Sequence, residues 1–253
     1  MSKEPLASRV ALVTGAGRNI GREIALSLAA SGVAIAVNVR SSVEEGQAVV
    51  DEIKARNGHA LLCVADVAEQ DAVRQMIANI DAHWGRLDIL VNNAAVRREA
   101  KVDDISAADW HRIVAIILDG AFFCTQAALP LLRRSEQAAI INIGGMTGHS
   151  GAANRVHVVT AKAGLAGMTR ALAHEIAPDG ITVNCVAPGM IDTVRHAASS
   201  AASPDHRRRH HTLLARHGTA ADIAQSVTWL AGDGARFVTG QVIHVNGGAY
   251  VGG

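Results

Sequence analysis

The hydrophobic positions of the chain form short, nearly continuous runs that alternate with longer stretches of helical spacing. The run Val10–Thr14 is apolar and ends at glycines, which is typical of a strand buried on both faces. From Ile20 to Ala30 the apolar residues recur every three or four positions, so one helix face is expected to be buried. This alternation continues along the chain. Strands are predicted at 10–14, 33–39, 60–65, 87–91, 138–143, 181–186 and 241–245, and helices at 20–30, 43–56, 70–84, 106–132, 156–177 and 220–230.

The order of these elements predicts the fold class. Strands that alternate with helices and are apolar throughout indicate an α/β fold, a doubly wound parallel sheet with helices on both faces. No repeat or linker interrupts the pattern, so residues 1–253 are expected to form a single Rossmann-type domain. The stretch 190–216 departs from it, because it is rich in Ala, Ser, His and Arg and too long for an ordinary connection. We interpret it either as a solvated surface excursion or as a lid over a substrate pocket.

Composition and charge narrow the class of protein. Hydrophobic residues make up 49% of the chain and charged residues 19%, which predicts a sizeable core. With 24 Lys and Arg against 23 Asp and Glu, no electrostatic argument favours a nucleic-acid or membrane partner. The apolar runs look too short to span a membrane, and the first residues lack a signal-peptide core. The isolated cysteines Cys63, Cys124 and Cys185 are expected to be reduced core residues of a cytoplasmic protein, and no metal site is expected.

A glycine-rich turn, residues 14–21, connects the first predicted strand to the first predicted helix. Its glycines let the backbone turn sharply, and the helix N-terminus offers N–H groups to a pyrophosphate. The second strand ends at Arg40 and Ser41 without an acid, so Arg18 and Arg40 favour the 2′-phosphate of NADP(H). The alternative is that Arg40 is simply exposed. The residues of the turn that are expected to contact the cofactor are Gly15, Arg18, Asn19, Ile20 and Gly21.

Further motifs stand at the ends of the predicted elements. They are Asp66-Val67, Asn92-Asn93-Ala94-Ala95, Ala161-Lys162-Ala163-Gly164-Leu165, Val183-Asn184, Pro188-Gly189, Thr239-Gly240 and Asn246-Gly247-Gly248. Together with the glycine-rich turn, the chain resembles the short-chain dehydrogenase/reductase family, especially its β-ketoacyl-ACP-reductase-like members. The resemblance implies a single Rossmann-type domain, a nicotinamide cofactor and a homo-oligomer, often a tetramer. We expect the substrate to be a small carbonyl or hydroxyl compound, either free or linked to a carrier or CoA. The resemblance also implies further cofactor contacts at Ser41, Asp66, Val67, Asn93, Ala94, Lys162, Pro188, Gly189, Ile191 and Thr193.

The catalytic positions depart from the family pattern of Asn, Ser, Tyr and Lys. Lys162 matches the lysine, which would hold the nicotinamide ribose. The asparagine, serine and tyrosine positions fall on Ile117, Gly145 and Val158. Valine cannot transfer a proton and glycine has no hydroxyl, so the usual carbonyl-reductase mechanism is not expected to operate.

Two histidines could supply the missing acid. His157 precedes Val158, and His149 follows Gly145 in a loop that lines the substrate pocket in the family. The alternative interpretations are a capping or surface histidine for His157 and an ordinary loop residue for His149. Thr147 could replace the serine hydroxyl. Tyr250, the only tyrosine, could enter a neighbouring subunit's site but is expected to pack at a subunit interface.

Three functions remain open at this point. One is an NADP(H)-dependent oxidoreductase with altered proton delivery, and another is a catalytically silent NADP(H)-binding subunit that partners an active relative. The third is non-redox chemistry, such as dehydration, in the same pocket. The run 207–211 (RRRHH) could attract a phosphorylated carrier or be a solvated loop. Trp84, Trp110 and Trp229 are expected to pack in the core or between helices.

Overall fold

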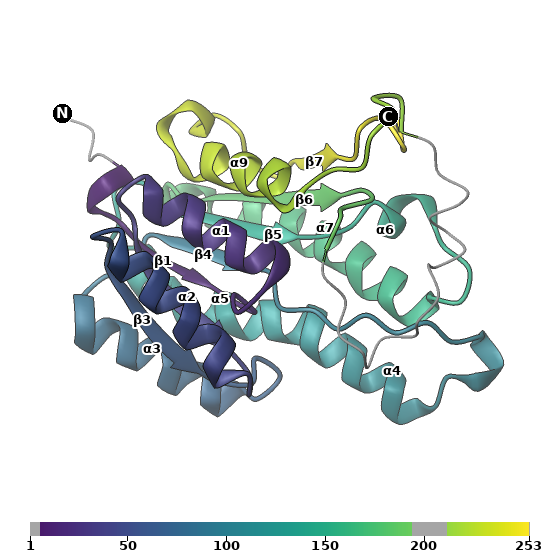
Figure 1. The fold of residues 1–253 in the computed structure, drawn as a ribbon, viewed down its shortest axis with the longest axis horizontal. Helices are drawn as coiled ribbons and strands as arrows, with labels where there is room; N and C mark the ends of the chain where they lie inside the picture. The colour runs from purple at the N-terminus through teal and green to yellow at the C-terminus, as the bar shows by residue number, and fades with distance from the viewer. Residues whose placement is uncertain (1–5, 194–211, 253) are drawn as a thin grey trace.

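The predicted strands form and join one parallel sheet in the computed structural model, which describes residues 6–193 and 212–252 (Figure 1). The strand order is β3-β2-β1-β4-β5-β6-β7, and each neighbouring pair is parallel. The expected doubly wound α/β fold is therefore confirmed. The strands are β1 (Val10–Val13), β2 (Ala34–Val39), β3 (Ala60–Val64), β4 (Ile89–Asn92), β5 (Ala139–Ile143), β6 (Thr182–Pro188) and β7 (Val242–Val245).

Helices cover both faces of the sheet, and a separate hydrophobic cluster lies under each layer. Helices α1, α2 and α9 pack on one face, and α3, α5 and α7 on the other (Figure 1). The apolar spacing predicted this, because each helix buries one side only. The long helices are α1 (Asn19–Ala30), α2 (Val43–Ala55), α3 (Gln70–Trp84), α4 (Ala107–Val114), α5 (Gly120–Leu132), α7 (Val156–Ile176) and α9 (Ala220–Ala231).

The helix predicted over 106–132 is continuous but contains a π-helical turn at Ala115–Asp119 between α4 and α5. Ser106 caps it by accepting a hydrogen bond from the backbone N–H of Asp109 (3.0 Å). By length and composition Ala107–Leu132 is a helix of the described residues that could span a membrane: its most apolar window of 18 residues has a mean hydropathy of 1.7, and 44% of that window is buried inside the protein. Cys124 and Ala128 bury against the sheet in the cluster that holds α3 and α7. We therefore interpret this helix as a core helix.

The site is positioned by the carboxyl edge of the sheet. All strands are parallel, so the segments that follow β1, β4, β5 and β6 emerge at the same edge. The strand order reverses between β1 and β4, which is where doubly wound folds bind their ligands. A short helix that the sequence did not predict, α6 (Thr147–Ser150), follows β5 at this edge.

Some expectations need correction, and others fall outside the described residues. The Trp229 side chain is 45% exposed, so it is not a core residue. The three cysteines are free and buried as predicted, and burial raises the pKa of Cys63 to about 11 and of Cys124 to about 12. The expected lid at 190–216 is described only at its two ends. The basic run 207–211 lies outside the described residues.

Candidate cofactor and catalytic site

The glycine-rich turn leaves a cradle at the N-terminus of α1. Gly15 (φ 62°) and Asn19 (φ 51°) adopt left-handed backbone angles, which glycine and, among larger residues, asparagine tolerate best. A Cβ at Gly21 would overlap the Gly15 carbonyl oxygen and lie 2.5 Å from Nδ2 of Asn93, so no side chain fits there. The first turn of α1 carries no acid. These features suit the close approach of a pyrophosphate.

Hydrogen bonds from the segment after β4 hold this turn in place. The Thr14 hydroxyl oxygen accepts from the backbone N–H groups of Asn93 (2.9 Å) and Ala94 (3.0 Å). The Asn93 side-chain amide donates to the carbonyl oxygens of Thr14 (2.9 Å) and Gly15 (3.1 Å). Asn93 and Ala94 thus fix the conformation of the turn, whichever contacts they make with a cofactor.

Asn38 is a functional candidate that sequence reasoning missed. It is buried in β2, where its Oδ1 accepts from the Gly15 N–H (3.2 Å) and its Nδ2 donates to the carbonyl oxygens of Cys63 (3.2 Å) and Ala65 (3.1 Å). It therefore joins the glycine-rich turn to the ends of β2 and β3. The signal in the sequence was one amide within an otherwise apolar strand.

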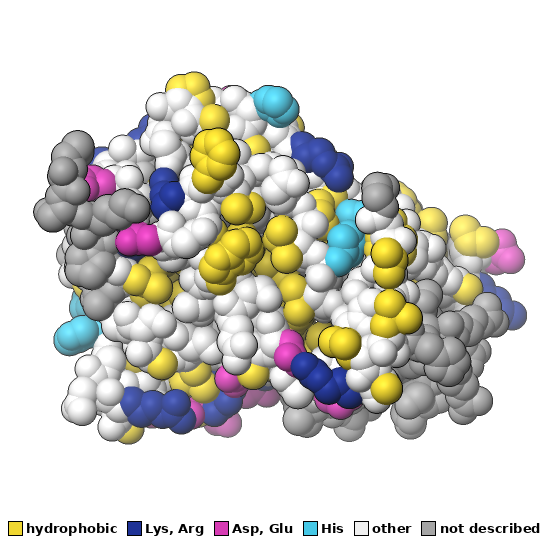
Figure 2. Space-filling model, turned by 90° about the horizontal axis from the view of Figure 1, so that it is seen from above, with side chains coloured by type: hydrophobic (Ala, Val, Ile, Leu, Met, Phe, Trp, Pro, Cys, Tyr) yellow, Lys and Arg dark blue, Asp and Glu magenta, His cyan; other side chains and the backbone are white. Residues whose placement is uncertain are grey.

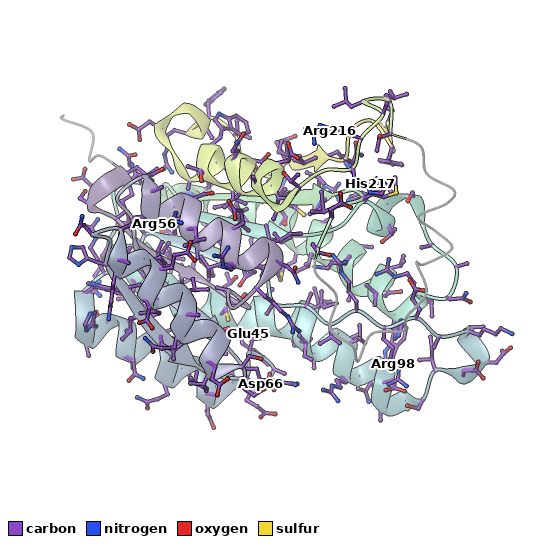
Figure 3. The ribbon with its side chains drawn as sticks, in the orientation of Figure 1. Glu45, Arg56, Asp66, Arg98, Arg216 and His217 are labelled. Carbon is purple, nitrogen blue, oxygen red and sulfur yellow. The ribbon has the colours of Figure 1, made fainter. Side chains whose placement is uncertain are left out.

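The side of the turn near the ends of β2 and β3 carries both signs of charge. Arg40 and Ser41 are exposed, as is the Arg18 side chain at 52%. Nη1 of Arg18 lies 3.7 Å from Oε1 of Glu45, an acid in the first turn of α2 that sequence reasoning did not consider. An exposed pair at this distance is worth at most about 1 kcal/mol, so a phosphate could displace it. Asp66 accepts from the Ala68 N–H (3.0 Å), and Figure 3 shows Asp66 and Glu45 in the same region of the molecule.

Two of the three positions at which the family resemblance implies Asn, Ser and Tyr belong to the core. Ile117 and Val158 are buried in one apolar cluster, where α4, the π-helical turn, α5 and α7 meet. The third, Gly145, follows β5 and is half-buried. A Cβ there would meet nothing closer than Cγ of Lys162 at 3.9 Å. The family resemblance implies polar side chains at all three positions. Two of them instead hold packed aliphatic side chains, and the third borders open space.

The π-helical turn itself is centred on Ile117. Such turns occur mostly as single widened turns within α-helices and are frequent at functional sites. The π-helical turn is therefore present at the expected asparagine position, although the residue there is Ile117.

Lys162 reaches the carboxyl edge from α7. Its ammonium group donates to the carbonyl oxygen of Ile143 at the end of β5 (2.5 Å). Burial lowers its pKa from 10.5 to about 8. The Cys185 charge opposes this shift, and the charges of Arg97 and Arg155 add to it. This group can therefore exchange a proton near neutral pH.

His157 does not reach the site. Its side chain is completely buried, and neither ring nitrogen has a hydrogen-bond partner among the described residues. The expectation of a capping or surface residue was therefore wrong. A ring without accessible surface cannot contact a substrate unless the start of α7 rearranges. The reason is geometric, since one residue along a helix turns the side chain by about 100° from Val158.

His149 lies on α6 and belongs to a small group of rings. Its ring centroid is 4.7 Å from that of His244 and 6.1 Å from that of Tyr250, and Tyr250 is 5.0 Å from His244. Burial, together with the charge of Arg170, lowers the pKa of His149 below 6.5. Tyr250 thus packs within its own chain, and its hydroxyl group lies against Gly252. His149 is mainly neutral at pH 7.

The segments beside the expected nicotinamide position are held by backbone pairing. The N–H of Gly189, after Pro188, donates to the Val245 carbonyl oxygen (3.0 Å), and Ile191 forms a parallel bridge with Gly218. Ile191 is buried, and Thr193 is half-buried where the described chain stops. Residues 6–193 and 212–252 contain no group of three His, Cys, Asp or Glu side chains that could hold a metal.

Comparisons with known proteins agree with this arrangement. The family described as Enoyl-(Acyl carrier protein) reductase matches residues 15–250. The chain is 42% identical over 246 residues to 3-oxoacyl-[acyl-carrier-protein] reductase FabG of Staphylococcus aureus, which covers 96% of this chain and 99% of the relative. It is 39% identical over 246 residues to (2S)-[(R)-hydroxy(phenyl)methyl]succinyl-CoA dehydrogenase subunit BbsD of Thauera aromatica, with 95% and 96% covered.

A solved structure shows the same fold. It is a short chain dehydrogenase from Burkholderia cenocepacia in complex with NADP, which has a TM-score of 0.90 and 34% identity. The match covers 97% of this chain and 99% of that one. Together with the parallel sheet, the glycine-rich turn and Lys162 at the carboxyl edge, these matches show that the chain belongs to the short-chain dehydrogenase/reductase family.

Proposed function

We propose that this protein is an NADP(H)-dependent oxidoreductase that acts on a small carbonyl or hydroxyl compound, as a 3-oxoacyl-ACP reductase does. The observation that carries the proposal is the set of hydrogen bonds that holds the glycine-rich turn in place. The side chains of Thr14 and Asn93 and the Oδ1 atom of Asn38 all hydrogen-bond to backbone groups in or next to the turn around Gly15, and so hold it in the form that a dinucleotide needs. The Staphylococcus relative, a reductase of acyl-carrier-protein thioesters by its name, supports the substrate class.

NADP(H) fits the cradle. The turn that Gly15, Asn19, Ile20 and Gly21 form at the N-terminus of α1 would hold the pyrophosphate. Arg18, released from its pair with Glu45, and Arg40 would bind the 2′-phosphate, and the NADP complex of the Burkholderia neighbour supports this choice. Further contacts come from Ser41, Asp66, Val67, Ala94, Pro188, Gly189, Ile191 and Thr193. The bound cofactor would supply the hydride, and this chain would orient it and move the proton.

Proton delivery falls to Lys162 and His149. Lys162 holds the nicotinamide ribose and has an ammonium group whose pKa of about 8 allows donation near neutral pH. His149 follows Gly145 on α6, and its lowered pKa favours the neutral ring, which suits a base in the oxidative direction. His157 takes part only if the first turn of α7 opens. Ile117, Gly145 and Val158 stand in for the missing asparagine, serine and tyrosine.

A second candidate is a catalytically silent NADP(H)-binding subunit that partners an active relative. The observation in its favour is the burial of Ile117 and Val158 in one apolar cluster, because a site repacked in this way gains stability without needing turnover. The Thauera relative, which is named as a subunit of a dehydrogenase, supports the possibility of such a partnership.

We also propose that the protein forms a cytoplasmic homo-oligomer, a tetramer by analogy with the family. Strand β7 is the last of the sheet, and the side chains of Trp229 and Phe237 beside it are exposed. Figure 2, which views the molecule from the side of α9 and β7, shows hydrophobic side chains gathered across this face. Exposed apolar patches of this kind favour association.

The test is to titrate the protein with NADPH and NADH and then to follow NADPH oxidation with 3-oxoacyl thioesters. We expect NADPH to bind at least about 10-fold more tightly than NADH, because a guanidinium–phosphate pair is charge-assisted. Arg40→Ala should reduce this preference. The matched control is Arg56→Ala, an exposed arginine paired with Glu52 at the end of α2, and it should leave the preference unchanged (Figure 3).

The same experiment separates the two candidates. Oxidation at a rate about 10² to 10⁴ below that of an intact family site supports the oxidoreductase. NADPH binding without any turnover, together with co-purification of a related chain, supports the silent subunit. Equal binding of the two nucleotides would remove the argument from Arg18 and Arg40.

A further inference from the structure

Three rings from separate segments meet at the carboxyl edge of the sheet. They belong to His149 on α6, His244 in β7 and Tyr250 in the segment that follows β7. The ring centroids of His149 and His244 are 4.7 Å apart, and the two ring planes meet at 75°. The centroid of Tyr250 lies 5.0 Å from that of His244 and 6.1 Å from that of His149. We call these three residues the ring clasp, and Figure 1 shows α6 and the segment after β7 at the same end of the molecule.

The segment after β7 folds into a turn that places the Tyr250 ring. The side-chain amide of the buried Asn246 donates to the Tyr250 carbonyl oxygen (2.9 Å), and its Oδ1 accepts from the Gly248 N–H (2.8 Å). Gly247 (φ 60°) and Gly248 (φ 80°) supply the left-handed backbone angles that the turn requires. The turn therefore brings Tyr250 back to the strand that carries His244.

Helix α6 connects the ring clasp to Lys162. It is a single turn, Thr147–Ser150, and a helix this short is not stable without tertiary contacts. Gly148 packs against α7, because a Cβ there would lie 3.0 Å from the backbone nitrogen of Ala163 and 3.2 Å from Cβ of Lys162. The next residue, His149, contacts the other two rings. The position of α6 beside Lys162 therefore depends on the ring clasp.

The ring clasp favours neutral imidazoles. Nδ1 of His244 is buried and has no hydrogen-bond partner among the described residues. Burial lowers the pKa of His244 below 6.5, and the charge of His149 lowers it further. Burial also lowers the pKa of His149, and the charge of Arg170 adds to that shift. A proton on either ring is therefore unfavourable while the rings are packed together.

The neighbouring charges on α7 are positive. They are those of Arg170, which acts on His149, and of Lys162, against whose Cβ α6 packs. In β6 the residue opposite His244 is the uncharged Ala187. Protonation of either imidazole therefore adds positive charge where positive charge already lies.

The segment 212–219 lies against the glycines of the same turn, and its charged side chains are paired. Both Nη atoms of Arg216 lie 2.9 Å from the carboxylate of Asp222. Nδ1 of His217 lies 2.9 Å from Oδ1 of Asp192. These two acids are thus engaged with other partners and do not offset a charge on the ring clasp.

We propose that the ring clasp closes while both imidazoles are neutral and opens when they are protonated, so that His244 and Tyr250 position α6 beside Lys162 in a pH-dependent way. Two like charges in adjacent rings, one of them with an unpartnered buried N–H, favour the open form. In that form the histidines regain an ordinary pKa near 6.5. The open form therefore binds protons more readily, and the closed form is lost as the pH falls below 6.5. The ring clasp requires neither nucleotide binding nor turnover, so the inference does not depend on the proposed function.

The test follows the rings by NMR in the whole protein, without nucleotide, with ring-¹³C-labelled tyrosine and histidine. Tyr250 is the only tyrosine, so its ring signals need no assignment. As the pH falls from about 8 to 5, we expect these signals to move toward the position that they have in urea. The signals of His149 and His244 are assigned by their loss from His149→Gln and His244→Gln, and both should titrate with midpoints below 6.5.

Variants separate the ring clasp from ordinary packing. Tyr250→Ala should raise both histidine midpoints toward 6.5, whereas Tyr250→Phe keeps the ring and should leave them low. His149→Gln combined with His244→Gln should abolish the pH-dependent shift of the Tyr250 signals. The matched control is His59→Gln, an exposed histidine just before β3, which should preserve the shift.

Hydrogen exchange measures the effect on α6. After correction for the intrinsic pH dependence of exchange, the backbone of residues 146–151 should exchange several-fold faster at pH 5.5 than at pH 7.5, and the double histidine variant should lose this difference. Near-UV circular dichroism confirms that the protein stays folded over the range that is compared.

Three results would overturn the inference. The first is a set of Tyr250 signals that does not move in the folded protein, and the second is a pair of histidine midpoints at or above 6.5. The third is a Tyr250→Phe variant that behaves like Tyr250→Ala. Exchange of α6 that is independent of pH would remove the link between the ring clasp and Lys162. Because no nucleotide is present, none of these results depends on whether the protein is an oxidoreductase.

Discussion

The nucleotide half and the catalytic half of the carboxyl edge differ in how they use polar atoms. Around Gly15, the side chains of Thr14, Asn38 and Asn93 hydrogen-bond to backbone groups of the turn and of the segment after β4. On the other side of the site, Ile117 and Val158 pack in an apolar cluster. A buried polar network is stable only when its groups are hydrogen-bonded, and such a network is rigid. The hydrogen bonds around Gly15 therefore hold the turn in a form that suits a dinucleotide. In the second half, Ile117 and Val158, where the family resemblance implies asparagine and tyrosine, belong to the core, and Lys162 is the one expected catalytic residue there that matches the family pattern.

The largest expected effect comes from restoring the catalytic half. Gly145→Ser with Val158→Tyr should raise the rate of NADPH oxidation with acetoacetyl thioester by about 10² to 10⁴, which is the contribution of a positioned proton donor. The serine fits, because a Cβ at Gly145 meets nothing closer than 3.9 Å. The rate is measured from the loss of NADPH absorbance.

The control for that experiment is Gly145→Ser with Val158→Phe, which has the same ring without the hydroxyl group. Both large side chains at the buried Val158 cost about 1 to 3 kcal/mol of stability, so the pair isolates the proton. If the phenylalanine variant were as active as the tyrosine variant, the missing hydroxyl group at position 158 would not be what limits the catalytic half.

A somewhat smaller loss is expected on the nucleotide side. Gly21→Ala should weaken NADPH binding by about 100-fold, because the added methyl overlaps the Gly15 carbonyl and displaces the pyrophosphate cradle. The matched control is Gly167→Ala on the exposed face of α7, where a Cβ meets nothing within 4 Å and should stabilise the helix slightly. Both variants are compared by nucleotide titration and thermal unfolding. Unchanged NADPH binding by Gly21→Ala would show that the cradle does not hold the nucleotide.

The buried charge of Lys162 should make the free energy of unfolding depend on pH. Its pKa is lowered from 10.5 to about 8 by folding, so the ammonium destabilises the protein below pH 8, and this cost vanishes as the pH rises from about 8 to 10.5. Lys162→Met should therefore raise the free energy of unfolding at pH 7 by about 1 to 2 kcal/mol, after allowance for partial exposure and the lost bond to Ile143. The gain should shrink at pH 10.

Urea unfolding at both pH values measures this difference. Lys54→Met, at an exposed position in the last turn of α2, is the control and should change stability by less than about 0.5 kcal/mol at either pH. A Lys162→Met variant that is less stable than the original protein at pH 7 would contradict the sign of this shift.

The smallest effect concerns the acid that faces Arg18. Glu45→Gln should improve NADPH binding by about 2- to 5-fold and leave NADH binding nearly unchanged, because it frees Arg18 from a weak surface pair. Glu44→Gln, one residue earlier and exposed, is the control. If the Glu45 variant bound both nucleotides more tightly by the same factor, Arg18 would not be binding the 2′-phosphate.

The fold and the nucleotide turn could be predicted because their signals are local. A buried strand followed by glycines and an amphipathic helix is legible within residues 10–30. Asn38 and Glu45 were not predicted, because their roles arise from contacts between segments that are far apart in the sequence. His157 shows the limit of reasoning from adjacency, because a residue of suitable chemistry next to an expected site position is completely buried and has no hydrogen-bond partner among the described residues.

The most direct test of the account is a crystal structure of the protein with NADPH bound. We predict that the pyrophosphate lies on the turn at residues 14–21 and that Nζ of Lys162 leaves the Ile143 carbonyl for the nicotinamide ribose, at about 3 Å. Val158 would then line the pocket with no hydroxyl group beside the nicotinamide. A Lys162 far from the nucleotide, or the Tyr250 hydroxyl within hydrogen-bond reach of the nicotinamide pocket, would contradict the account.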